Sequence, residues 1–156
     1  MKKALITGIT GQDGAYLAKF LLDKGYEVYG TYRRLSTPNF WRLLYLNIFD
    51  KVKLIPADLV DTSSLMEAVR LSDPDEVYHL AAQSFVGASF EQPIGTGNIT
   101  GLGVTRMLEA IRMIKLLTPL VKLPPSLKKF VFENFRSSVT TLVIGDDTIL
   151  SLIHIS

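Results

Sequence analysis

The sequence predicts an α/β fold, in which helices cover a parallel sheet. Short apolar runs alternate with helix-patterned segments about every 20 to 30 residues, as in chains built from βαβ units. The chain has 156 residues, of which 47% are hydrophobic and 21% charged, so it is typical of one globular domain rather than of a disordered chain.

The first strand and helix are expected at the very start of the chain. Residues 4–7 are a short apolar run that ends in glycine, which is typical of a buried parallel strand. From Gly14 the apolar residues Leu17 and Leu21 recur at helical spacing. Gly25 stands where a helix C-terminal glycine belongs, so it marks the end of this helix.

The remaining elements continue the alternation. Pro56 is expected to stop the third strand, and Asp61 or Thr62 is expected to cap the helix after it. The predicted strands span 26–32, 51–58 and 75–82, and the predicted helices span 40–49, a segment from about 62, and 99–114. Together they predict a partial Rossmann-like fold, a doubly wound parallel sheet truncated after about four strands.

The alternation breaks near Lys115, which divides the chain into residues 1–114 and an atypical C-terminal tail, 115–156. Three prolines, at positions 119, 124 and 125, interrupt the tail. We expect short strands there, such as one at 140–145, or a loosely attached, disordered segment. A frameshift, read-through or truncated reading frame is the leading explanation of the tail, and a genuine divergent C-terminus is the alternative.

Composition argues against several kinds of partner. A net charge of +2 is too small to favour nucleic acid, and no apolar run is long enough to span a bilayer. The chain has no cysteine and two histidines, so neither a disulfide framework nor a metal site is expected. We therefore expect a soluble, cytoplasmic protein.

Three glycines, Gly8, Gly11 and Gly14, follow the first strand at intervals of three residues. In this position they favour a tight turn, a close backbone approach to a pyrophosphate, and close packing of the next helix. That helix would offer its N-terminal N–H groups to the phosphates. A plain glycine-rich connection is the alternative, whereas an ATPase-type loop is a poor one because Ala15 and Tyr16 stand in place of its Lys-Ser/Thr pair.

The second strand bears on the choice of cofactor. NAD sites usually carry an acidic residue there, but this strand is followed by Arg33 and Arg34. A guanidinium suits a 2′-phosphate by charge and geometry, so Arg33 predicts NADP. The alternative, that arginines merely solvate a surface turn, stays open, above all for Arg34.

Two strand ends complete the predicted site. Asp58 follows the third strand, where its carboxylate can face an adenine amino group while Leu59 packs on the ring, although a turn-capping aspartate is the alternative. Ala81 and Ala82 at the end of the fourth strand are small enough for a cofactor to lie across them. His79 lies within that strand and is interpreted as a core histidine rather than a catalytic one.

The motifs together resemble the extended short-chain dehydrogenase/reductase family. "TGITGQDGAYL", "YRR", "ADLVD" and "YHLAAQS" occur in its order and spacing. Within that family, "GITGQDGAYLA", "DEVYHLAAQS", "SFEQP" and "LEAIR" resemble the GDP-mannose 4,6-dehydratases more than the UDP-sugar epimerases. The resemblance covers about residues 1–114.

The resemblance implies an NADP-dependent lyase that converts GDP-mannose to GDP-4-dehydro-6-deoxy-mannose, and homo-oligomers for full-length members. It also implies that Asn98 matches an asparagine frequent in the family, although a helix-start residue explains it equally well. The cofactor-binding residues that it implies are Gly8, Ile9, Thr10, Gly11, Gln12, Asp13, Gly14, Arg33, Asp58, Leu59, Leu80, Ala81, Ala82, Gln83 and Ser84.

The catalytic residues of that family have no counterpart here. Its tyrosine base works with a lysine four residues later, whose charge lowers the tyrosine pKa. None of the six tyrosines has a lysine at that spacing, and none follows Tyr78. We therefore expect this chain alone to be inactive. A noncatalytic NADP-binding fragment, or part of another nucleotide-sugar epimerase or reductase, is the alternative.

Overall fold

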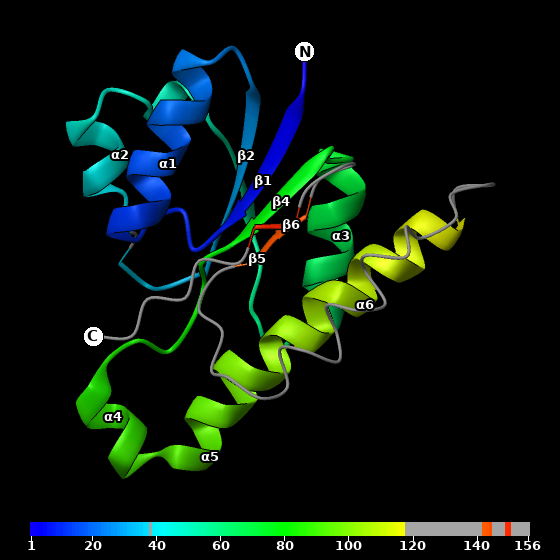
Figure 1. The fold of residues 1–156 in the computed structure, drawn as a ribbon. Coiled ribbons are helices and arrows are strands. Elements are labelled where there is room, and N and C mark those ends of the chain that lie inside the picture. Colours follow the sequence, from blue (N-terminus) through cyan, green and yellow to red (C-terminus); the bar gives the residue numbers. More distant parts are fainter. Residues whose placement is uncertain (38, 118–141, 145–148, 151–156) are drawn as a thin grey trace.

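A computed structural model describes residues 1–37, 39–117, 142–144 and 149–150. Four parallel strands form the main sheet in the order β3-β2-β1-β4 (Figure 1). This is the order of half a Rossmann sheet, as expected. Its strands are β1 (Lys3–Thr7), β2 (Glu27–Tyr32), β3 (Lys53–Pro56) and β4 (Glu76–His79).

Helices lie on both faces of this sheet. In Figure 1, α1 and α2 lie on one side of the strands, and α3 and α6 on the other. The fold is therefore doubly wound. The helical segments are α1 (Gln12–Asp23), α2 (Trp41–Tyr45), a 3₁₀ turn (Phe49–Lys51), α3 (Thr62–Ser72), α4 (Val86–Glu91), α5 (Pro93–Thr96), a π-helical turn (Gly97–Gly101) and α6 (Leu102–Leu117).

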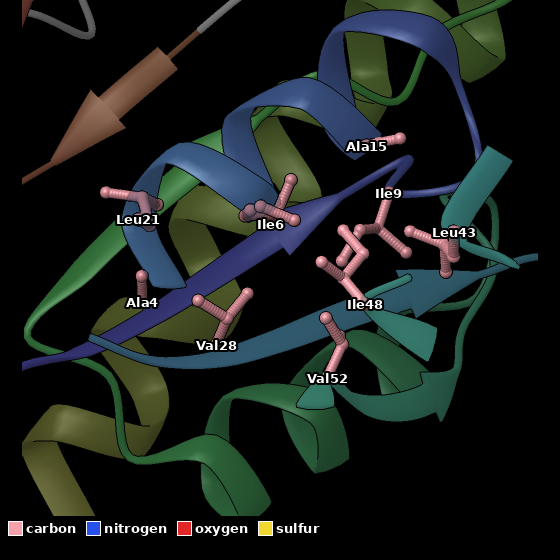
Figure 2. Close-up of a cluster of buried hydrophobic side chains, with 10 residues drawn as sticks. Ala4, Ile6, Ile9, Ala15, Leu21, Val28, Leu43, Ile48 and Val52 are labelled. Atoms are coloured by element: carbon pink, nitrogen blue, oxygen red, sulfur yellow. The ribbon is translucent and has the colours of Figure 1, made fainter. Parts of the chain in front are cut away.

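Two apolar cores hold the layers together, one on each face. Successive side chains of a strand point to opposite faces, so Ala4 and Ile6 join the core under α1, while Leu5 joins the core under α3 and α6. Figure 2 shows the first core, in which side chains of α1, β1 and β2 meet those from the α2 region. The cores fix the sheet between its helices and so place the strand ends.

The observed elements differ from the predicted ones mainly in length. The helix predicted at 40–49 is short, because Asn47 adopts a left-handed conformation (φ 54°) that ends it and leads into the 3₁₀ turn. Gly25 has φ 82°, which confirms it as the residue that ends α1. Asp61 caps α3 as expected, since its side chain accepts a hydrogen bond from the Ser63 amide at 3.0 Å. No element was predicted at α4 and α5.

Two short strands extend the sheet beyond its parallel part. β5 (Leu142–Ile144) pairs antiparallel with β4, and β6 (Ile149–Leu150) pairs antiparallel with β5. β5 falls within the strand expected at 140–145. The other expectations for the tail concern residues 118–141, 145–148 and 151–156, which lie outside the described residues.

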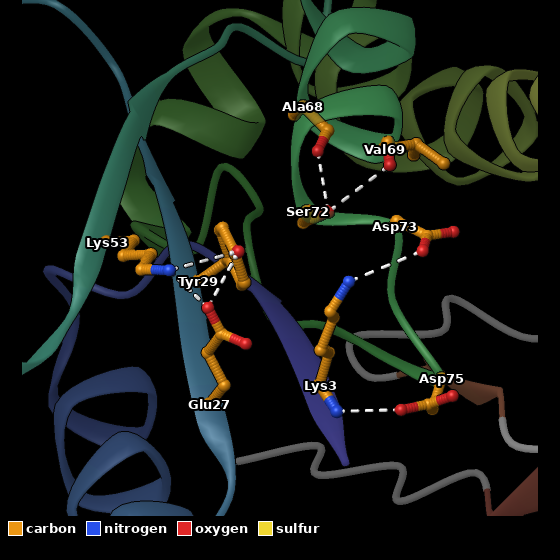
Figure 3. Close-up of polar contacts among 9 residues, drawn as sticks. All are labelled: Lys3, Glu27, Tyr29, Lys53, Ala68, Val69, Ser72, Asp73 and Asp75. Carbon is orange, nitrogen blue, oxygen red and sulfur yellow. Dashed lines mark hydrogen bonds and ion pairs between the residues drawn. The ribbon is translucent and has the colours of Figure 1, made fainter. Parts of the chain in front are cut away.

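Polar contacts tie together the amino-terminal ends of the strands (Figure 3). The Lys3 amide donates to the Asp75 carboxylate at 2.7 Å, and its ammonium pairs with Asp73 at 3.3 Å. On the other side of β1, Glu27 accepts from Lys53 and from the Tyr29 hydroxyl. These largely exposed contacts add little stability individually. The candidate site lies at the opposite, carboxyl-terminal edge of the sheet.

Across the described ranges, no helix combines the length and the apolar character needed to cross a membrane.

Candidate dinucleotide-binding site

A cavity of about 500 Å³ opens at the carboxyl-terminal edge of the parallel strands. This is where open α/β sheets bind their ligands, and its size suits a small organic molecule. Each of the four strands contributes to its wall through its last residues or the loop that follows. The lining residues are Gly8, Thr10, Gly11, Thr31, Tyr32, Arg33, Leu35, Asn39, Phe40, Ala57, Asp58, Leu59, Leu65, Leu80, Ala81, Ala82, Gln83, Ser84, Gln92, Gly95, Thr96 and Ile99.

The glycine-rich turn after β1 is packed too closely for side chains. Gly8 has φ 70°, and a Cβ there would lie 2.9 Å from the backbone N and Cα of Ala81. A Cβ on Gly14 would lie 2.5 Å from the Gly8 carbonyl oxygen. The Gly11 amide donates to that same oxygen at 2.9 Å. The three glycines therefore close a compact turn against the end of β4 and the start of α1.

The N-terminus of α1 is open toward this turn. Gly11 is its N-cap residue, and no side chain of the described part of the protein caps it. The first N–H groups of a helix have no partner within the helix and carry the positive end of its dipole. Arg42 lies nearby and donates from Nη1 to the Thr10 carbonyl oxygen at 3.1 Å. This arrangement suits a negatively charged group.

Eleven of the fifteen residues predicted to bind a cofactor line the cavity. The other four lie just outside it. Gln12 and Asp13 are exposed in the first turn of α1, and Gly14 is buried beneath that turn. Ile9 is fully buried, and its amide donates to the Thr31 carbonyl oxygen at 3.3 Å.

Ile9 packs directly over Gly30 in β2. A Cβ on Gly30 would lie 2.2 Å from the Cδ1 atom of Ile9, so only glycine leaves room for this side chain. The sequence analysis assigned no role to Gly30. Its place inside a β-rich run was the available signal, because glycine within a strand often marks a close approach by another group.

Arg33 follows β2 and lines the cavity, whereas Arg34 does not. Both side chains are exposed. Among the described residues that line the cavity, Arg33 is the one basic side chain and Asp58 the one acidic side chain. The end of β2 thus presents a cation where NAD sites usually present a carboxylate.

Asp58 and Leu59 lie after β3, as predicted. Asp58 also stabilises its own turn, because its Oδ1 atom accepts a hydrogen bond from the Val60 amide at 3.1 Å. Asp58 therefore does cap its turn, as the alternative interpretation expected, and it also lines the cavity. Leu59 is 7% exposed and belongs to the core under α3 and α6. Arg106 of α6 donates to its carbonyl oxygen at 3.3 Å.

Arg106 also explains the position of Asn98. Its guanidinium donates to the Asn98 carbonyl oxygen at 2.8 Å and to the Asn98 side-chain oxygen at 2.7 Å. Asn98 is thus held in the π-helical turn before α6, and it is not among the residues that line the cavity. The contacts of Asn98 are therefore explained by its place at the start of a helical segment, without a role in the cavity.

Thr7 connects the end of β1 to the end of β4. Its Oγ1 atom accepts hydrogen bonds from the amides of Leu80 and Ala81, both at 3.1 Å. It also lies 3.0 Å from Nδ1 of His79. His79 is 1% exposed, as expected of a core histidine, and burial lowers its pKa to about 4. It is therefore neutral at pH 7.

Sequence patterns missed the far wall of the cavity. Gly95, Thr96 and Ile99 come from α5 and the π-helical turn, and Gln92 is the residue just before α5. These short helices show too few turns for an apolar stripe to stand out. Asn39 and Phe40 were likewise missed, although the aromatic pair of Phe40 and Tyr32, with ring centroids 5.1 Å apart, flanks the end of β2.

The described part of the cavity wall contains no tyrosine–lysine pair. Among the described residues that line the cavity, Tyr32 is the one tyrosine and none is a lysine. No group of three or more His, Cys, Asp or Glu side chains in the described part of the chain is placed to hold a metal ion. The chemistry that these residues can perform is recognition of an anionic, partly apolar ligand.

A family model described as GDP-mannose 4,6 dehydratase matches residues 5–128, more than half of the chain. The chain belongs to the GDP-mannose 4,6-dehydratase family. This confirms the resemblance found in the glycine-rich turn, the end of β4 and the "SFEQP" and "LEAIR" segments.

Named members of the GDP-mannose 4,6-dehydratase family are about half identical to this chain. GDP-mannose 4,6-dehydratase of Yersinia enterocolitica is 49% identical over 118 residues, which are 72% of this chain and 32% of that protein. GDP-mannose 4,6 dehydratase 2 of Arabidopsis thaliana is 51% identical over 117 residues, 71% of this chain and 31% of that protein. The chain thus spans about a third of the length of the relatives that it matches.

Solved structures agree on the fold of this GDP-mannose 4,6-dehydratase family member. UDP-glucose 4-epimerase of Thermus thermophilus, in complex with NAD, matches with a TM-score of 0.63 and 30% identity, over 74% of this chain and 35% of the epimerase. UDP-glucose 4-epimerase of Brucella ovis, also in complex with NAD, matches with a TM-score of 0.63 and 26% identity, over 74% and 33% of the two chains.

Proposed function

We propose that this chain binds NADP in the cavity at the carboxyl-terminal edge of its sheet, as the cofactor-binding part of a GDP-mannose 4,6-dehydratase. The observation that carries the proposal is the cavity itself. It combines the glycine-rich turn, the open N-terminus of α1 and a cation at the end of β2. Family membership supplies the reaction, and NAD in the related epimerase structures supports a nicotinamide cofactor.

The residues present fit a dinucleotide. The space that a Cβ on Gly8 or Gly14 would fill is occupied by neighbouring backbone, so the turn lies close to the N-terminus of α1, whose first N–H groups would face a pyrophosphate. Apolar side chains such as Leu59 and Ile99 border the cavity, where they suit the flat face of a base. Asp58 provides an acceptor for an exocyclic amino group.

Charge favours NADP over NAD. The 2′-phosphate of NADP would be drawn to the Arg33 guanidinium, which can bind it through two parallel hydrogen bonds. The ribose of NAD would lack its usual acidic partner at this strand end. Asp58, the one carboxylate among the described residues of the cavity wall, follows the neighbouring strand β3, while the exposed Arg33 at the end of β2 offers the phosphate the opposite charge.

In the proposed reaction, the cofactor supplies a reversible hydride acceptor. The described residues would bind and orient it, while the tyrosine–lysine pair that such a reaction requires is missing from the whole sequence. GDP-mannose is therefore the proposed substrate of the longer enzyme. We expect these 156 residues to bind cofactor without turning over the sugar nucleotide.

Calorimetric titration with NADPH and NADH tests the binding proposal. The unmodified chain should bind NADPH more tightly than NADH. Arg33→Leu should weaken NADPH binding roughly 10- to 100-fold, the value of a charge-assisted contact, and leave NADH binding nearly unchanged. Arg34→Leu is the matched control, since this neighbouring arginine is also exposed and does not line the cavity. Equal affinity for the two cofactors, or no binding, would reject the role of Arg33.

Incubation with GDP-mannose and NADP tests the second part of the proposal. No 4-dehydro sugar should form. Turnover that is proportional to protein concentration and lost with Gly8→Val would show that another group in this chain replaces the missing pair.

A further inference from the structure

The hydrogen bonds of Thr7 determine where its proton goes. A hydroxyl group has one hydrogen to donate and two lone pairs to accept with. Both lone pairs of Thr7 Oγ1 face donors, the amides of Leu80 and Ala81, each at 3.1 Å. The hydroxyl hydrogen is left for the third neighbour, Nδ1 of His79 at 3.0 Å.

His79 must then accept through Nδ1, so its own hydrogen is on Nε2. Among the described residues, Nε2 has no hydrogen-bond partner. An unpaired polar atom in a side chain that is 1% exposed is destabilising, so packing alone gives no reason for an imidazole here. The contact that does use the imidazole is the one with Thr7.

The two amides held by Thr7 belong to the wall of the cavity. Leu80 and Ala81 both line it, and the backbone of Ala81 is the surface against which Gly8 packs. A displacement of this backbone would change the cavity wall and the glycine-rich turn together. The position of the Thr7 hydroxyl hydrogen therefore affects both the end of β4 and the glycine-rich turn of the proposed cofactor site.

We propose that His79 is a positioning residue of the cofactor site. By accepting the Thr7 proton at Nδ1, it orients both lone pairs of Thr7 toward the Leu80 and Ala81 amides and so holds the end of β4 against the glycine-rich turn. The link between this geometry and cofactor affinity rests on the proposed function, whereas the tautomer and the two amide hydrogen bonds do not.

Nuclear magnetic resonance of the whole chain tests the geometry without any cofactor. The chain has two histidines, His79 and His154, so the His154→Gln variant leaves one imidazole to observe. Its ring nitrogen and carbon shifts should show hydrogen on Nε2 and none on Nδ1 at pH 7. The Leu80 and Ala81 amides should exchange slowly. Hydrogen on Nδ1, or fast exchange of both amides, would overturn the proposal.

Matched substitutions test the consequence for binding. His79→Leu removes the acceptor with a side chain of similar branching, whereas His79→Asn offers an amide oxygen close to the position of Nδ1. Thr7→Val and Thr7→Ser form the corresponding pair for the hydroxyl group. We expect His79→Leu and Thr7→Val to raise the Kd for NADPH about tenfold, and the double variant to be no weaker than Thr7→Val alone.

His79→Asn and Thr7→Ser should stay within about threefold of the unmodified chain, and they should keep the slow exchange of the Leu80 and Ala81 amides. A merely structural histidine predicts a different result, in which His79→Leu lowers the stability of the chain but leaves both its amide exchange and its NADPH affinity unchanged. That result would overturn the proposal. Failure of the unmodified chain to bind NADPH would instead reject the proposed function, and the tautomer and exchange measurements would still decide the role of His79.

Discussion

Gly14 packs against the carbonyl oxygen of Gly8 so closely that a Cβ on residue 14 would lie 2.5 Å from that oxygen. Real Cβ atoms do not approach backbone at this distance, so the first turn of α1 depends on glycine at this position. Glycine at positions 8 and 14 is therefore a packing requirement, whatever the turn binds.

Gly14→Ala should destabilise the chain by about 1–3 kcal/mol, because α1 must move away from the turn. Alanine favours helices over glycine, so intrinsic propensity alone predicts the opposite sign. Gly97→Ala is the control, since a Cβ there would meet no atom of the described residues outside its own turn within 4 Å. Urea denaturation of both variants decides between packing and propensity, and a Gly14→Ala variant as stable as the unmodified chain would contradict the close contact.

Gly30→Ala should destabilise by a similar amount, about 1–3 kcal/mol, because its Cβ would overlap the Ile9 side chain, with Cδ1, Cγ2 and Cβ at 2.2, 2.7 and 2.8 Å. Ile9→Val removes Cδ1, the atom nearest to that Cβ, and alone should cost about 1 kcal/mol. Combined, the two changes should destabilise less than the sum of their separate effects. Strict additivity in a double-mutant cycle would show that overlap with Cδ1 does not cause the loss of stability in Gly30→Ala.

Stability should fall in mild acid through His79. Burial lowers the pKa of this group to about 4 from 6.5, so below pH 6.5 the unfolded chain takes up a proton that the folded chain refuses until about pH 4. The free energy of unfolding should therefore decrease between pH 6.5 and 4, by up to roughly 3 kcal/mol, and this contribution should not change further below pH 4.

His79→Asn isolates that contribution, because asparagine does not titrate. Carboxylates with lowered pKa, such as Glu27, Glu67 and Glu109, add their own loss of stability in acid to both proteins. The difference between the unmodified chain and the variant should therefore change with pH between 6.5 and 4. Parallel curves over that range would mean that His79 titrates normally in the folded chain.

Arg42 and Arg33 should affect cofactor binding differently. Arg42 donates to the Thr10 carbonyl oxygen and lies 4.4 Å from the Trp41 ring centroid, so it supports the glycine-rich turn rather than the end of β2. Arg42→Met should weaken NADPH and NADH binding by the same factor, about 3- to 10-fold, whereas Arg33→Leu should act on NADPH alone. A selective loss of NADPH binding in Arg42→Met would assign Arg42 to the 2′-phosphate instead.

The strands and helices that could be predicted depend on short-range patterns in the sequence. The apolar run 4–7, the helical spacing of Leu17 and Leu21, and the left-handed glycine at 25 each depend on residues close together in the chain. The order of alternating elements then restricts the topology, since parallel strands need crossover helices. The glycine spacing and Arg33 located part of the cavity wall for the same reason, because carboxyl ends of parallel strands share one edge.

The sequence by itself determined the α/β alternation, the site of the glycine-rich turn and the lack of a Tyr-x-x-x-Lys pair. Tertiary structure alone decided that Thr7 meets His79 across 72 positions, that Ile9 fills the space over Gly30, and that α5 completes the cavity. These contacts join residues far apart in the chain. Their geometry depends on how strands and helices pack together, which no local pattern specifies.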